Sequence, residues 1–190
     1  IEFVDIAGLV KGASKGEGLG NKFLSHIRET DSIVEVVRCF DDSNIVHVDG
    51  SVDPIRDIET INLELVLADL ETVNKRIERA AKLAKGDKKY YAEEDLFKKI
   101  RDHLEAGKPT RTLELNDDEK EIIKDAFLLT MKPILYVANV SEADIGKENE
   151  YVAKVKEYAK AENSEVVQLC VKIEEELSSL EGDEKQEMLE

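Results

Sequence analysis

The sequence has 190 residues, with 27 lysines and arginines against 43 aspartates and glutamates, and its formal net charge is −16. This acidic balance argues against an overall basic nucleic-acid binder, although a local basic face stays open. Apolar residues make up 42% and charged residues 37%, which is typical of a soluble, helix-rich globular protein. No run approaches the roughly 20 apolar residues of a membrane span. We therefore expect a cytoplasmic protein with no membrane partner.

The cysteines and the first residues of the chain support the same location. Cys39 and Cys170 lie inside apolar runs and predict buried, reduced thiols. Two cysteines and three scattered histidines show no metal-ligand spacing. Glu2 and Asp5 interrupt the first apolar run, which is therefore no signal peptide. Because the chain opens directly in an apolar run without Met, we expect it to be a piece of a longer protein.

The first forty residues predict strands on either side of a glycine-dense stretch. Residues 1–5 predict a short strand that ends in a carboxylate. Five of the ten glycines follow within residues 8–20, a segment that loses much backbone entropy on ordering. A helix is expected over residues 21–28. The β-branched run at residues 32–40 predicts a buried strand of a parallel sheet.

The pattern becomes helical after Pro54. Apolar residues recur at three- or four-residue steps over residues 58–84, which predicts a long amphipathic helix stopped by Gly86 and Asp87. A second helix is expected near residues 91–106, and the two form an antiparallel hairpin. Asn116 is the expected N-cap of a third helix, with three acidic residues in its first turn.

Sheet elements return after Pro133. Strands are expected at residues 134–138 and 166–171, with helices over residues 151–161 and from residue 173. The alternation predicts an α/β fold with a parallel sheet and an inserted α-helical hairpin. The expected division is a nucleotide-binding part at 1–57, a helical insertion at 58–131 and a second nucleotide-binding part at 132–190.

Two short motifs follow predicted strands, at the sheet edge where open α/β sheets bind ligands. Asp5-Ile6-Ala7-Gly8 is a D-x-x-G motif. Its carboxylate can hold Mg²⁺ through water, and its glycine N–H can approach a terminal phosphate. The motif also arises by chance in ordinary turns.

Asn139-Val140-Ser141-Glu142 follows the strand at 134–138. An asparagine there can present a donor and an acceptor to a purine, and Glu142 can accept from a base amine. A helix-capping turn is the alternative for this short motif.

Longer stretches connect the two motifs to a known family. The sequence FVDIAGLVKGASKGEGLGN at residues 3–21 resembles the Obg-like translation-factor GTPases. Arg38-Cys39-Phe40 and the motif at residues 139–142 resemble the YchF branch, the ribosome-associated ATPases. The resemblance implies a Ras-like nucleotide fold with a helical insertion, ATP hydrolysis with Mg²⁺, and ribosome association. A small C-terminal β-rich domain normally follows in this family.

The resemblance also implies roles for particular residues. It places Asp5 near the metal, Gly8 at the γ-phosphate, and Asn139, Val140 and Glu142 at the base. No G-x-x-x-x-G-K-[ST] phosphate loop occurs in the sequence. We therefore expect that loop upstream of Ile1, and we expect this chain alone to be inactive.

Two residues at the base-recognition motif favour ATP over GTP. Guanine-specific members of this superclass carry N-K-x-D, whereas Val140 here replaces the lysine and Glu142 the aspartate. The lysine stem over the base is lost, and the longer carboxylate fits the two adjacent donors of guanine poorly. Adenine still offers its single exocyclic amine.

The water-activating group is also unusual. Many relatives place Gln directly after D-x-x-G, where this sequence has Leu9. His47 is our candidate for the missing function, because an imidazole can polarise water at neutral pH. Packing of His47 between Val46 and Val48 is the structural alternative.

The predicted hairpin carries a local basic excess. Residues 71–102 hold ten lysines and arginines against seven acids, and Lys82, Lys85, Lys88 and Lys89 lie near the tip. This pattern predicts a face toward the ribosome or ribosomal RNA, and a plain solvated face is the alternative. A non-enzymatic helical-hairpin adaptor on a degenerate nucleotide fold is the competing function.

Overall fold

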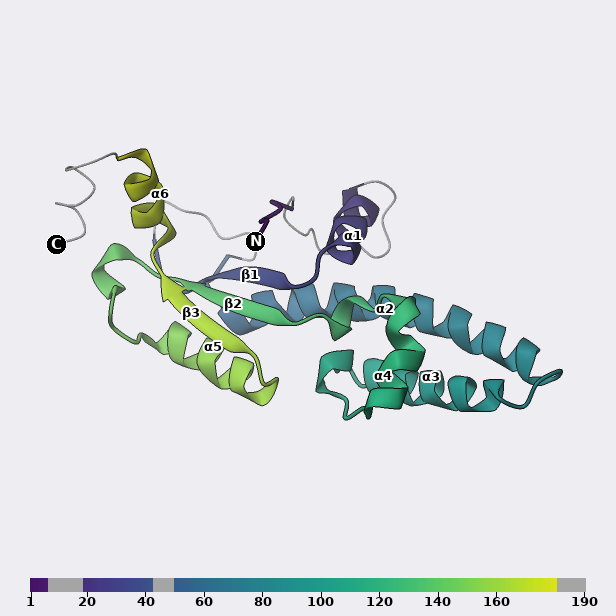
Figure 1. The fold of residues 1–190 in the computed structure, drawn as a ribbon. Helices are drawn as coiled ribbons and strands as arrows, with labels where there is room; N and C mark the ends of the chain where they lie inside the picture. Colours follow the sequence, from purple (N-terminus) through teal and green to yellow (C-terminus); the bar gives the residue numbers. More distant parts are fainter. Residues whose placement is uncertain (7–18, 43–49, 181–190) are drawn as a thin grey trace. The chain divides into compact units, whose positions relative to one another are not determined.

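A computed structural model describes residues 1–6, 19–42 and 50–180 (Figure 1). The chain forms two compact units. The helical unit comprises Ile1–Ile33 and Glu59–Pro133, and the sheet unit comprises Val34–Ile58 and Ile134–Glu190. None of the helices in the described ranges is both long and apolar enough to cross a bilayer.

The helical unit is built around a long hairpin. Its helices are α1 (Leu19–Glu29), most of α2 (Pro54–Ala84), α3 (Tyr90–Glu105) and α4 (Asp117–Ile123). Helices α2 and α3 run side by side from a short turn, as the apolar periodicity predicts (Figure 1). Short 3₁₀ turns at Thr110–Thr112, Lys124–Ala126 and Leu129–Met131 connect the later part of the unit.

The start of α2 differs from the expectation drawn from periodicity. The helix begins at Pro54 rather than near Ile58. Proline is favoured at the first helical position because its missing N–H has no intrahelical partner there. Asp53 caps the helix, since its Oδ1 accepts from the Arg56 N–H at 3.2 Å.

The third helix follows its predicted capping pattern. The Asn116 side chain accepts from the Glu119 N–H, and the Glu119 carboxylate accepts from the Asn116 N–H, both at 2.8 Å. This reciprocal pair is a capping box, which satisfies two backbone donors that the helix itself leaves open. The prediction that Asn116 is an N-cap is therefore confirmed.

Helix α2 is buried on two faces. One face contributes Val66 and Val73 to a core shared with Phe97 and Ile100 of α3. Another face contributes to a second core cluster, which also includes α1 and has these buried members: Leu24, Ile27, Leu65, Ala68 and Leu129. Because apolar side chains cover α2 from both sides, any polar residue between them needs a partner inside the protein.

Asp69 is that polar residue, and its side chain has no exposed surface. Its two carboxylate oxygens accept from the N–H groups of Leu129 and Thr130, each at 2.8 Å, and from the Thr130 hydroxyl at 2.7 Å. The Thr130 Oγ1 in turn accepts from the Thr110 N–H at 3.0 Å. Burial raises the pKa of Asp69, against the lowering effect of these hydrogen bonds.

The sheet unit contains three strands in the order β1 (Ile33–Arg38), β2 (Ile134–Asn139) and β3 (Glu165–Leu169). Strands β2 and β3 are parallel, in a register that runs from Leu135 opposite Glu165 to Asn139 opposite Leu169. The Cys39 N–H donates to the Asn139 carbonyl at 2.8 Å, and Ile33 likewise pairs with Pro133, so β1 runs in the same direction. The predicted α/β fold with a parallel sheet is confirmed.

Two helices complete the sheet unit, α5 (Glu150–Ala161) and α6 (Val171–Ser179). Helix α5 lies along β2 and β3 and buries Val152 and Val155 (Figure 1). The central strand β2 is the most buried of the three, and Tyr136 within it has no exposed surface. Its hydroxyl donates to Glu162 at 3.0 Å, which satisfies the polar end of the ring.

The strand predicted at residues 1–5 is wrong. The structure shows no regular secondary structure over residues 1–6, and Phe3 and Val4 are 80% and 56% exposed. A strand exists only where a neighbour satisfies its backbone N–H and C=O groups. No such ladder forms between this segment and the described residues, so an apolar β-branched sequence stays irregular.

We predict that Asp69→Asn lowers the free energy of unfolding by about 1–3 kcal/mol, because an NH₂ group then faces a buried backbone N–H. Urea denaturation checks this value. Asp95→Asn, a change at an exposed position inside α3, is the control and should leave stability unchanged. Equal stability of the two variants would contradict a structural role for Asp69.

The same variant should alter the pH dependence of stability. Between the usual Asp pKa of 3.8 and its raised value in the folded state, the native protein keeps a proton that the unfolded chain has lost. Stability attributable to Asp69 therefore falls as the pH rises through this window. Asp69→Asn should remove that slope.

Candidate functional site

The carboxyl ends of the three parallel strands meet at one edge of the sheet unit. Three segments leave this edge: residues 39–42 after β1, residues 140–149 after β2, and the start of α6 after β3. Open parallel sheets bind ligands at this edge, because loops of independent sequence converge there. The edge is therefore the candidate site.

Asn139 links all three strand ends. Its backbone carbonyl accepts from Cys39 at the end of β1. Its side-chain Oδ1 accepts from the N–H of Val171, the first residue of α6, at 3.0 Å. The amide Nδ2 has no partner among the described residues, and the side chain is half-buried. Asn139 thus uses its acceptor to hold the site and keeps its donor available.

The next three residues have different exposures. Val140 is 1% exposed, and its N–H donates to the Leu169 carbonyl at 2.9 Å. The Ser141 hydroxyl donates to Asp144 at 2.9 Å. Glu142 is exposed and begins the 3₁₀ turn Glu142–Asp144. A contact from Glu142 to a ligand would use its side chain, whereas Val140 would act through the packing of the loop.

A second asparagine braces the same loop. The Asn149 Nδ2 donates to the Cys39 carbonyl at 2.8 Å and to Asp144 at 3.2 Å. Its Oδ1 accepts from the Val152 N–H at 2.9 Å and so caps α5. Gln168 donates to the carbonyls of Asp144 and Lys147 at 3.1 and 2.7 Å. The loop is therefore fixed from the ends of β1, β3 and α5.

Sequence reasoning missed these bracing residues. Asn149 lies directly before a helix, a position where asparagine is favoured, so an N-cap signal was present. Its second bond, to the Cys39 carbonyl, spans 110 residues. Gln168 lies in a strand and carries no such signal. Only the fold brings it to the loop.

The segment after β1 is folded on itself. The Arg38 Nε donates to the Phe40 carbonyl at 3.1 Å, and the guanidinium lies 4.9 Å from the centroid of the Phe40 ring. The Tyr151 hydroxyl donates to Asp41 at 2.9 Å, and this hydrogen bond to Asp41 raises the pKa of Tyr151. The Arg38-Cys39-Phe40 motif therefore shapes one wall of the edge.

The two cysteines are free and buried, as predicted. Cys39 has no exposed surface, and burial raises the pKa of its thiol to about 12. A thiol with such a pKa stays protonated at neutral pH and is a poor nucleophile.

The other sequence-predicted site residues belong to other segments of the chain. Asp5 is exposed, in the irregular first segment of the helical unit. Gly8 and His47, together with Leu9, lie outside the described residues. The structure thus brings Asn139, Val140 and Glu142 together on one loop.

The described ranges contain no group of three or more His, Cys, Asp or Glu side chains arranged to hold a metal. A single carboxylate such as that of Asp5 suits a different kind of metal site, in which most ligands come from outside the protein. The exposed Asp5 carboxylate is the kind of single oxygen ligand that Mg²⁺ takes together with water and phosphate oxygens.

Comparisons with known proteins place this geometry in context. No family model matches the chain. It is 59% identical, over its whole length, to the ribosome-binding ATPase YchF of Bacillus subtilis and covers 52% of that protein. It is 46% identical to the Obg-like ATPase 1 of Saccharomyces cerevisiae, with 97% of the chain and 49% of the relative aligned. The chain spans about half the length of the curated relatives that it matches.

A solved structure agrees with the sequence comparison. The YchF GTPase of Schizosaccharomyces pombe superposes on 96% of the chain with a TM-score of 0.80 and 40% sequence identity. The chain covers 51% of that structure. The names of these relatives include both ATPase and GTPase.

We predict that Cys39 resists alkylation in the folded protein, because its thiol is buried and its pKa is raised to about 12. Iodoacetamide treatment followed by peptide mass spectrometry should find Cys39 modified in urea and protected in native buffer. Equal modification under both conditions would contradict the burial of this strand end.

Proposed function

The chain belongs to the YchF family of ATPases by homology over its whole length, and on this premise we propose what the full-length protein does. It binds and hydrolyses a nucleoside triphosphate, ATP in preference to GTP, and associates with the ribosome in the cytoplasm. The observation that carries the proposal is the Asn139–Glu142 motif at the carboxyl edge of a parallel sheet, within a chain whose relatives are named ATPases or GTPases.

The base binds at the loop after β2. Asn139 offers its Nδ2 donor, because its Oδ1 is already held by Val171. Glu142 accepts from the exocyclic amine of adenine with its exposed carboxylate. Val140 contributes by keeping a lysine stem out of the site and by packing the loop. These roles favour adenine on chemical grounds, while the names of the relatives include both nucleotides.

Hydrolysis uses residues toward the start of the chain. Asp5 would hold Mg²⁺, and the Gly8 N–H would meet the γ-phosphate. When bound, the metal neutralises charge on the phosphates. His47 orients the attacking water in place of the glutamine that Leu9 replaces. Support for these roles comes from the motif and the family, since Gly8, Leu9 and His47 lie outside the described residues.

The adaptor hypothesis has no support from the comparisons. The reported relatives are named ATPases or GTPases, and their names give no sign of a non-enzymatic protein.

Association with the ribosome is supported by the hairpin and by the printed name of the bacterial relative. We call residues 79–91, at the end of α2 and the start of α3, the hairpin tip. Its lysines Lys82, Lys85, Lys88 and Lys89 are exposed. They form a local cationic surface on a chain with a net charge of −16.

We predict that Glu142→Asp in the full-length protein shifts the nucleotide preference from ATP toward GTP by about tenfold, since a charge-assisted hydrogen bond is worth about 1.5–3 kcal/mol. Glu142 is a better position for this test than Val140, where a lysine would be buried. Titration with both nucleotides measures the ratio. Glu157→Asp, at an exposed position of α5, is the control. An unchanged ratio would show that Glu142 does not read the base.

We also predict that charge reversal at Lys82, Lys85, Lys88 and Lys89 weakens co-sedimentation with ribosomes. The slope of log affinity against log salt should fall by about 3, since each lost phosphate contact removes about 0.7–0.9. Reversal of Lys154 and Lys156, exposed lysines of α5 that pair with Glu150 and Glu148, is the control. Undiminished co-sedimentation of the tip variant would show that these lysines do not contribute to ribosome binding.

A further inference from the structure

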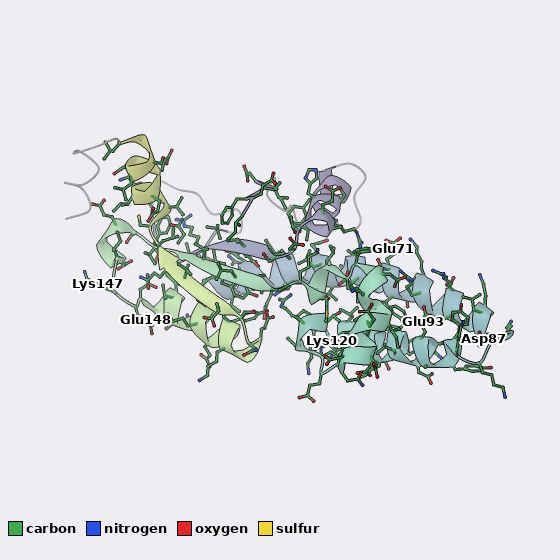
Figure 2. All side chains as sticks on the ribbon, viewed as in Figure 1. Glu71, Asp87, Glu93, Lys120, Lys147 and Glu148 are labelled. Atoms are coloured by element: carbon green, nitrogen blue, oxygen red, sulfur yellow. The ribbon has the colours of Figure 1, made fainter. Side chains whose placement is uncertain are left out.

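The hairpin tip is an ordered turn. The N–H groups of Gly86 and Asp87 both donate to the Leu83 carbonyl at 3.0 Å, which closes the end of α2. Asp87 then leads into α3, which begins at Tyr90. The Asp87 side chain accepts from the Lys89 N–H at 3.1 Å, and its carbonyl accepts from the Tyr90 N–H at 3.2 Å. Figure 2 shows Asp87 at the far end of the hairpin from Lys120 in α4. Side chains on this turn are therefore presented on a defined backbone.

Most basic residues of the hairpin tip lack an ion-pair partner in the described part of the chain. Along the body of the hairpin the basic residues have acidic partners, in these pairs: Lys75–Glu71, Arg76–Asp125, Lys98–Glu94, Lys99–Glu119 and Arg101–Asp102. At the tip, Lys89 pairs with Asp87 at 3.1 Å. Arg79, Lys82, Lys85 and Lys88 form no ion pair with any residue of the described part. The unneutralised cations of the hairpin are thus concentrated at its end.

Helix stability accounts for only some of these cations. Lys82 and Lys85 lie at the carboxyl end of α2, where the helix dipole favours positive charge. Lys88 and Lys89 precede the amino end of α3, where the dipole disfavours it. Lys89 also occupies the N-cap position and makes no side-chain capping bond. The ion pair with Asp87 offsets this cost for Lys89, whereas Lys88 has no ion pair in the described part of the chain. Residues that break a local rule without a structural gain are expected at functional positions.

Aromatic surface accompanies the cations. Tyr91 is 51% exposed in the first turn of α3, and Leu83 on α2 is 37% exposed. Tyr90 is half-buried, and the Lys89 Nζ lies 5.1 Å from the centroid of its ring. An exposed aromatic ring among lysines can stack on a base while the cations meet the phosphates on either side.

We propose that the hairpin tip binds an unpaired segment of RNA, in which a base stacks on Tyr91 and phosphates contact Lys82, Lys85 and Lys88. This inference rests on the proposed ribosome association and names its chemical target as unpaired ribosomal RNA. A duplex covers the faces of its bases and would use the lysines alone. An acidic protein surface would likewise not need the exposed ring.

The test compares binding of the full-length protein to a labelled single-stranded oligouridylate and to an RNA duplex of the same length. The single strand should bind more tightly. Tyr91→Ala should weaken its binding by about 5- to 100-fold without changing the salt dependence, and Tyr91→Phe should retain binding, because stacking uses the ring. Lys85→Glu with Lys88→Glu should lower the salt slope by about 1.4, as expected for two phosphates of a single strand.

Several outcomes would overturn the proposal. One is unchanged affinity of Tyr91→Ala for the single strand, and another is equal binding of single strand and duplex. A wild-type protein that co-sediments with ribosomes but does not bind the oligonucleotide would assign the tip a protein partner instead. All the changed side chains are exposed, so we expect the variants to fold. Thermal unfolding checks this.

Failure of the proposed function gives a different result. In that case the wild-type protein neither hydrolyses nucleotide nor co-sediments with ribosomes. The comparison of wild type with Tyr91→Ala on the oligonucleotide still decides whether the tip binds unpaired RNA.

Discussion

A carboxylate without exposed surface, Asp69, fixes the helical unit. Its partners, the N–H groups of Leu129 and Thr130, belong to a 3₁₀ turn that offers them few partners of its own. A buried charge without hydrogen bonds would cost several kcal/mol. The hydrogen bonds of Asp69 therefore hold α2 and the turn against each other. The Thr130 hydroxyl extends the contact to Thr110. Through one residue, the middle of α2 thus orders two irregular segments that have little secondary structure to define them.

In the sheet unit, too, polar side chains hold distant segments together by hydrogen bonds to backbone groups, but these side chains are neutral. Asn139 and Asn149 satisfy backbone groups at the ends of strands and at the starts of α6 and α5. Their bonds fix the loop that carries Glu142 before any ligand arrives. A preorganised loop loses little conformational entropy on binding, so more of the interaction energy remains for discrimination between bases. The proposed preference for adenine depends on this rigidity as much as on the carboxylate itself.

Helix α4 and the hairpin tip differ in how well their residues follow the local preferences of a helix. At α4, Asn116 and Glu119 form a capping box, and Glu119 also pairs with Lys99. These two interactions agree with the local preferences of a helix start. At the start of α3, Lys88 and Lys89 stand where the helix dipole disfavours cations, next to the exposed ring of Tyr91. The contrast between α4 and the hairpin tip is the physical basis for assigning partner binding to the tip and a structural role to α4.

The sequence by itself determined the helical hairpin, the cap at Asn116, the parallel strands and the family, because periodicity, capping and motifs are local signals. Tertiary structure decided what depends on distant partners. Residues 1–5 have a strand's composition but no ladder among the described residues, Val140 is buried where its motif suggested a ligand contact, and Asn139 reaches Val171 across 32 residues. The reason is that one segment is buried and hydrogen-bonded by other segments of the chain. Its own sequence therefore does not say which partner it will have.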